Sequence, residues 1–147
     1  MKRLAFACAL AWAGAGSAQD AAAPQGYSFE QPELLADQHV WGIVHGARLL
    51  AQACARASHG GAAEAWVDWQ EREAAQIGAM RVVLSRHYFR TDDASPDALA
   101  AALGLKQALA LPAGELGPAC ATLAEALAQP RYDLSKRREE VLAKFRK

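Results

Sequence analysis

The chain has 147 residues, and its 16 Lys and Arg residues balance its 16 Asp and Glu residues. A chain of this length can form one compact domain with an ordinary core. Without a basic excess, nucleic acid is not expected as a partner, because phosphate binding depends on a concentrated basic surface. Hydrophobic residues make up 52% of the sequence, but many are alanine, which favours helices and buries little area.

Residues 1–18 have the three parts of a secretory signal peptide. A basic start at Lys2 and Arg3 precedes an apolar run over residues 4–13, and small residues follow up to Ala18. The run is shorter than the roughly 20 residues of a membrane span, which argues against an anchor. Cleavage after Ala18 would place the mature protein in the periplasm or outside the cell, without a membrane span. A lipidated start at Cys8 is the alternative, but it leaves almost no apolar segment before the cut.

Cleavage would leave two cysteines, Cys54 and Cys120. In an oxidising compartment two cysteines most simply form one disulfide bond. The competing interpretations are that Cys54 is a free thiolate that binds a soft metal, or that both cysteines pair with another chain. We predict the internal disulfide, because the compartment is oxidising and only two cysteines remain after cleavage.

Residues 19–31 are predicted to be a flexible leader, because they are small, polar and interrupted by Pro24 and Gly26. A single helical domain is then expected over residues 32–147. Its first helix should begin near Pro32 or Asp37, end near Ser58, and bury a face with helical spacing. That face consists of Val40, Val44, Ala47, Ala51 and Cys54.

A turn over residues 58–61 predicts an antiparallel second helix over residues 62–89, with glycine at the C-terminal cap of the first. Antiparallel geometry about this turn would bring Arg48 near Glu71 or Glu73, and His45 near Gln76. Gly42 and Gly46, on either side of His45, are interpreted as positions where helices pack closely.

Three shorter helices should follow. Ser95, Pro96 and Asp97 are a strong start signal for a helix over residues 96–109. A short helix around Cys120 should end before Pro130. A last helix is expected from Ser135, with one buried side formed by Val141, Leu142 and Phe145.

No segment alternates with the period of a strand, and no internal repeat is visible. The predicted fold is therefore all-α, a small bundle of four to five helices led by a long antiparallel helical hairpin and joined by one disulfide.

The histidines do not have the spacing of a standard metal site, since the sequence contains neither His-x-x-x-His nor Cys-x-x-Cys. A site could still form between helices, where His45, Met80 and His87 would suit copper if Cys54 were reduced. The alternative for these residues is ordinary packing, and no cofactor is expected.

Three tryptophans, Trp41, Trp66 and Trp69, lie on the predicted hairpin. Most such rings belong to the core, but any that is exposed would mark a partner surface. No nucleotide-binding loop is recognisable in the sequence. No nucleophile–base pair is recognisable either, since Ser85 and His87 are two residues apart and would face different directions on a helix.

The sequence therefore predicts an exported helical binding protein without catalytic activity, such as an inhibitor, an immunity-type factor or an accessory factor. Its partner would be another envelope protein. A periplasmic metal- or small-molecule-binding protein, with copper handling as the sharpest version, is the alternative.

Overall fold

The computed structural model describes residues 23–112 and 114–146. The predicted signal peptide and its cleavage site therefore lie outside the described residues. Every regular element within them is a helix, as predicted. The elements are α1 (Pro32–Arg56), α2 (Gly60–Arg72), α3 (Ala74–Phe89), α4 (Pro96–Ala102), α5 (Leu116–Ala121), α6 (Leu123–Leu127), the 3-10 helix η1 (Pro130–Tyr132) and α7 (Leu134–Phe145).

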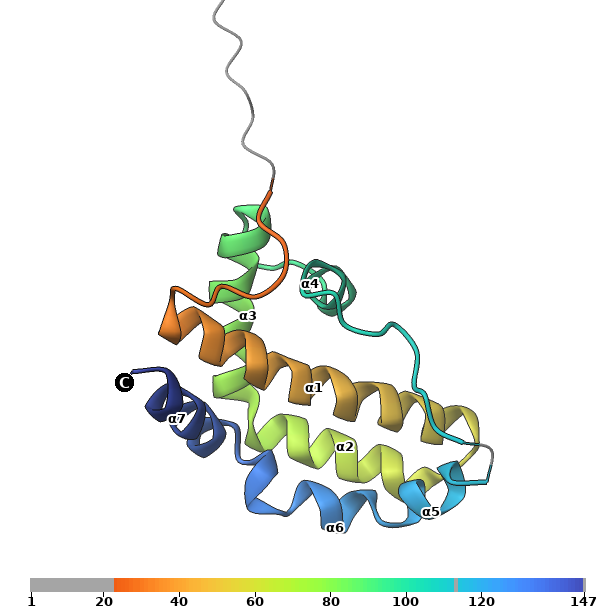
Figure 1. Cartoon of the computed structure of the whole chain (residues 1–147). Coiled ribbons are helices and arrows are strands. Elements are labelled where there is room, and N and C mark those ends of the chain that lie inside the picture. Colours follow the sequence, from red (N-terminus) through yellow and green to blue (C-terminus); the bar gives the residue numbers. More distant parts are fainter. Residues whose placement is uncertain (1–22, 113, 147) are drawn as a thin grey trace, which may run out of the picture.

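α1 is the central element of the bundle (Figure 1). α2 runs back beside it, α6 packs against α2, α5 contacts the end of α1, and α7 packs against the first half of α1. Large side chains without exposed surface form the core where these helices meet, among them Trp69, Leu84, Leu99 and Leu134. The predicted buried stripe of α1 is confirmed, because Val40, Val44, Ala47, Ala51 and Cys54 are all buried.

A disulfide joins Cys54 near the end of α1 to Cys120 in α5, with the two Cα atoms 5.5 Å apart. The predicted pairing is therefore confirmed. The bond connects positions 66 residues apart in the chain, so it holds the α5–α6 segment against the end of the α1–α2 hairpin.

The turn between α1 and α2 has its left-handed residue at a different position from the one predicted. Ser58 does so, with φ of 62°, whereas Gly60 and Gly61 already belong to α2. The hairpin itself is correct, but the glycines begin the second helix and do not end the first.

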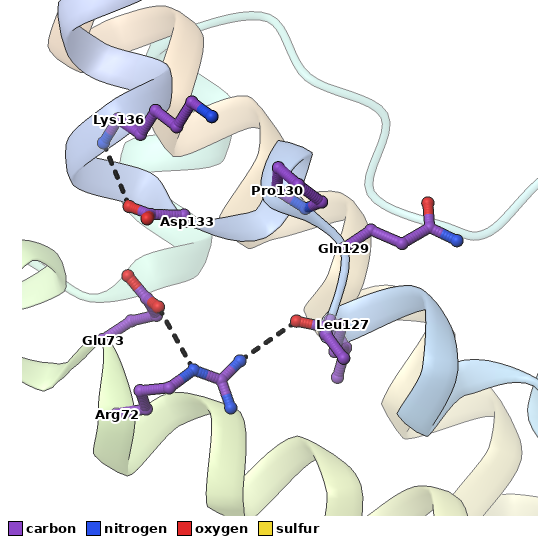
Figure 2. A pocket seen from close by; sticks show the side chains of 8 residues that line it. Arg72, Glu73, Leu127, Gln129, Pro130, Asp133 and Lys136 are labelled. Carbon is purple, nitrogen blue, oxygen red and sulfur yellow. Dashed lines mark hydrogen bonds and ion pairs between the residues drawn. The ribbon is translucent and has the colours of Figure 1, made fainter.

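The predicted helix over residues 62–89 is divided at Glu73, where φ is −94° and ψ is 5°. Contacts from far along the chain accompany this break: Arg72 donates to the Leu127 carbonyl, and the Glu73 carboxylate accepts from the Leu134 backbone N–H at 3.1 Å. Figure 2 shows the Arg72 guanidinium between the Glu73 carboxylate and that carbonyl. α3 therefore leaves the hairpin at an angle and packs beside α1 and α4 (Figure 1).

This division also makes the expected helix-to-helix register wrong. Arg48 pairs with Asp97 at 2.6 Å and not with Glu71 or Glu73. The Nε2 atom of His45 lies 2.7 Å from the Lys106 carbonyl oxygen, so the hydrogen-bond partner of this histidine is Lys106 and not Gln76. Because the carbonyl oxygen is an acceptor, Nε2 of His45 donates.

The helix predicted over residues 96–109 begins as predicted but ends earlier. Ser95 caps α4 by accepting a hydrogen bond from the Ala98 backbone N–H at 3.1 Å. α4 stops at Ala102 and not at Leu109, because Gly104 has φ of 69° and the Leu105 N–H bonds back to the Ala100 carbonyl. This is the arrangement with which glycine commonly ends a helix.

The C-terminal part follows the prediction with two differences. The expected short helix is two, α5 and α6, divided at Thr122. α7 begins at Leu134 behind an Asp133 cap, and Val141 and Leu142 are buried as predicted. The prediction for Phe145 was wrong, because 41% of this side chain is exposed.

Candidate functional site

Four rings from three distant segments form a partly exposed cluster, which we call the aromatic patch. It consists of Tyr27, Phe29, His39 and Phe145. The Tyr27 ring lies 5.2 Å from His39 and 6.3 Å from Phe29, and the Phe145 ring stacks on His39 at 5.8 Å. Phe29 is 72% exposed, which is unusual for a large apolar ring in contact with other rings.

Hydrogen bonds from α1 and α3 hold the segment that carries Tyr27 and Phe29. The buried Gln38 side chain accepts from the Ser28 backbone N–H at 2.8 Å and donates to the Tyr88 hydroxyl at 2.6 Å. Tyr88 in turn donates to the Gly26 carbonyl. The second half of the predicted flexible leader therefore lies against the domain, and its backbone is attached on both sides of Tyr27.

Tyr88 is the buried end of this network. Burial raises the pKa of the Tyr88 phenol to about 12, so its hydroxyl keeps its proton and acts as a donor throughout the physiological range. The Gly26 N–H also bonds to the Ala102 carbonyl at 2.8 Å. The N-terminal segment is thus tied to α1, α3 and α4 together.

Ion pairs fix the other side of the patch. Arg138 of α7 contacts the buried Asp37 at 2.5 Å and Glu33 at 3.1 Å, and Arg146 also pairs with Glu33. The two guanidinium groups lower the pKa of the Glu33 carboxyl. Because Asp37 is almost completely buried, a charged partner is needed there to offset its desolvation. These pairs hold the end of α7, and with it Phe145, beside α1.

A groove continues from the patch along α1, and we call it the glycine groove. Its volume is about 360 Å³. Gly42, Ile43, Gly46 and Ala47 of α1 form its floor, and Arg131, Tyr132 and Arg137 form its other wall. A Cβ atom on Gly42 or Gly46 would meet no atom within 4 Å. These glycines therefore do not serve close packing inside the domain, and that interpretation of them was wrong.

His39 and Arg137 connect the patch to the groove. His39 lies one turn before Ile43 on α1, and Arg137 lines the groove from α7. Burial lowers the pKa of His39, and the charge of Arg137 lowers it further. At neutral pH the patch therefore presents a neutral imidazole beside a cationic wall. We call the aromatic patch and the glycine groove together the α1 surface.

The structure does not gather the three residues of the suggested copper site. His45 is buried, and its ring nitrogens lie by the Lys106 carbonyl and the Arg48 guanidinium. Met80 is a core residue, whereas Nε2 of His87 lies 3.3 Å from the Ser28 hydroxyl. Cys54, which that site required as a thiol, is in the disulfide. Among the described residues no three His, Cys, Asp or Glu side chains are arranged to hold a metal ion.

Two of the three tryptophans cannot form a partner surface. Trp41 and Trp69 are buried, and Trp69 donates to the Tyr132 carbonyl at 2.9 Å. Trp66 is half-buried and stacks on Trp69 at 5.3 Å. These rings supply core area, as was expected for most of them. The phenylalanines Phe29, Phe89 and Phe145 are exposed, and Phe29 and Phe145, which the sequence placed in a flexible leader and on a buried face, belong to the aromatic patch.

Ser28 and His87 are the closest approach to a nucleophile–base pair. Gln38 also donates to the Ser28 hydroxyl, while no hydrogen bond within residues 23–112 and 114–146 orients Nδ1 of His87. A third group that orients the base is part of such a catalytic arrangement. The contacts of Ser28 and His87 instead hold the N-terminal segment on α3.

A larger hollow of about 620 Å³ lies between the end of α2, the link from α6 to η1 and the beginning of α7 (Figure 2). Three of its charged side chains have structural partners: Arg72 donates to the Leu127 carbonyl, Glu73 accepts from the Leu134 backbone N–H, and Asp133 accepts from the Lys136 backbone N–H. Gln129 points away from the other labelled side chains. These contacts explain the junction and provide no convergent set of free polar groups for a ligand.

Within the described part of the chain, no helix has both the length and the apolar character of a membrane span. Comparison with known proteins found no matching family model, no matching curated protein and no matching solved structure.

Proposed function

We propose that the protein is an exported, non-catalytic binding protein whose α1 surface docks on a second protein of the cell envelope. The observation that carries the proposal is the aromatic patch, in which Phe29 and Phe145 are exposed on two segments that hydrogen bonds and ion pairs attach to α1. Exposed rings on a rigid support are typical of residues that contribute most to protein–protein binding.

Order in the free protein favours this proposal. The Gln38 network and the Arg138–Asp37 pair fix the segments that carry the rings. Binding then requires little further loss of side-chain and backbone freedom, and such preorganisation raises affinity.

Site-specific photocrosslinking in the organism that makes the chain tests the proposal. p-Benzoylphenylalanine placed at Phe29 should give a discrete adduct with one protein. The matched control is the same probe at Val67 of α2, an apolar residue that is 49% exposed outside the α1 surface. Equal adducts from the two positions, or none from Phe29, would contradict the proposal.

Export is tested separately by mass spectrometry of the natural product. Cleavage after Ala18 should give a mature chain that begins at Gln19. An intact chain that begins at Met1 would remove the envelope from the proposal and leave the binding surface to be tested inside the cell.

A further inference from the structure

We propose that the glycine groove binds an acidic amphipathic helix of the partner protein, with Arg131 and Arg137 pairing with its carboxylates. This inference rests on the proposed function and adds the chemistry of the partner. It follows from the shape of the groove floor and from the charge of its wall.

The floor allows the backbone of a partner to come close. Gly42 and Gly46 are four residues apart, so they lie on one side of α1, and open space lies over both. Glycine within a helix is unfavourable relative to alanine, and no described element packs against these two positions in return. Positions without side chains let a second helix approach closely, while Ile43 and Tyr132 provide apolar contacts beside them.

The wall selects a negatively charged partner. Arg131 forms no ion pair with any of the described residues. Its guanidinium lies over the Tyr132 ring, 5.2 Å from the centroid, which leaves its donors free for a carboxylate. Arg137 pairs with Glu140 at 3.0 Å, and both side chains are more than a third exposed. Such an exposed pair is weak, so a partner carboxylate can take the place of Glu140.

A second copy of this chain does not fit the same charges. A two-fold symmetric contact brings identical surfaces together, and here it would place Arg131 and Arg137 of one copy near the same arginines of the other. An amphipathic helix with carboxylates on its polar side has the opposite charge and fills a groove with residues spaced three and four apart.

Two synthetic amphipathic helical peptides test the inference on the full mature chain. They share the same apolar positions, but one has Glu at every polar position and the other has Lys. In NMR titrations the acidic peptide should shift the backbone amides of Gly42, Ile43 and Gly46, and the basic peptide should not. Arg131→Glu together with Arg137→Glu should weaken binding of the acidic peptide at least about tenfold. Glu140→Gln should strengthen it a few-fold.

Gly46→Leu would fill the groove without disturbing the fold, so it distinguishes loss of peptide binding from unfolding of the protein. It should abolish the amide shifts while the protein unfolds at no lower temperature, because the position has open space and leucine favours helices. Gly78→Leu is the matched control, since Gly78 is also a glycine within a helix with open space and lies in α3, outside the groove. It should bind the acidic peptide as the wild type does.

Three results would overturn the inference: equal binding of the acidic and basic peptides, no shift at Gly42 and Gly46 with the acidic peptide, or unchanged binding by Gly46→Leu. If crosslinking from Phe29 succeeds and the groove binds nothing, the partner occupies only the aromatic patch. If crosslinking from Phe29 fails, the proposed function itself is wrong, whatever the peptides do.

Discussion

Gly46 lies within α1, where glycine lowers helix stability by roughly 1 kcal/mol relative to alanine. Because a Cβ there would meet no atom within 4 Å, we expect Gly46→Ala to raise the free energy of unfolding by about 0.5–1 kcal/mol. Urea unfolding measures this change, and Gly78→Ala in α3 should behave alike. A loss of stability in Gly46→Ala would mean that the added methyl group contacts the groove wall, and that the groove is narrower than described.

His87 gives the fold a dependence on pH. Burial lowers the pKa of His87, so the unfolded chain takes up a proton first as the pH falls below the ordinary value of about 6.5. Above about pH 6.5 His87 is neutral in both the folded and the unfolded chain, so it does not reduce the stability of the fold. As the pH falls through that value toward the folded-state pKa, protonation of His87 in the unfolded chain lowers the free energy of unfolding. We expect the free energy of unfolding to decrease between about pH 7.5 and pH 5.5.

His87→Asn isolates this effect, because the variant has no group that titrates in this range at position 87. Burial and Arg137 also lower the pKa of His39, so some dependence on pH should persist in the variant. The decrease in its free energy of unfolding should nevertheless be smaller than in the wild type. Parallel curves for the two proteins would show that protonation of His87 does not affect folding.

The division between α2 and α3 depends on contacts of Arg72 and Glu73 with the chain around α6 and α7. Glu73→Ala removes the acceptor of the Leu134 N–H and the partner of Arg72. We expect it to lower the free energy of unfolding by about 1–3 kcal/mol. Glu73→Gln keeps an oxygen acceptor and should lose less. Denaturant unfolding monitored by circular dichroism measures both, and a Glu73→Ala variant as stable as the wild type would contradict this role.

This junction also shows what could be predicted at the scale of elements. Apolar spacing correctly predicted α1, and Ser95 and Asp97 correctly predicted the beginning of α4, because these signals are local. The spacing over residues 62–89 stays helical through Glu73, so it carries no sign of the break. The contacts that accompany the break come from Leu127 and Leu134, which are 55 and 61 residues away from their partners, and no local pattern contains them.

The end of α4 was predictable and was missed. Gly104 adopts the left-handed conformation that ends the helix, and a glycine after an apolar helical segment is a known stop signal.

The candidate site was harder to find. Tyr27 and Phe29 were the signal, as two aromatic residues within a leader that otherwise looked polar. Their neighbours His39 and Phe145 come from other elements, so only the packing of α7 on α1 identifies the cluster.

At the scale of the whole molecule, a few ties between distant positions hold the bundle together. Gln38 and Tyr88 attach the N-terminal segment to α1 and α3, and Arg138 attaches α7 to Asp37 at the beginning of α1. Both ties support the α1 surface at its aromatic end. The disulfide acts at the opposite end of α1, so the fold is fastened at both ends of its longest helix.

Among these ties, the disulfide is expected to contribute the most to stability, because it closes a loop between positions 66 residues apart. In the chain-entropy model such a loop stabilises the fold by roughly 4 kcal/mol through the unfolded state. The Cys54→Ala, Cys120→Ala double variant should lose about this much in denaturant unfolding. Wild-type protein unfolded under a reducing agent is the control, and it should fall to a similar free energy. A loss below about 1 kcal/mol in both experiments would mean that the reduced unfolded chain already keeps Cys54 and Cys120 close together.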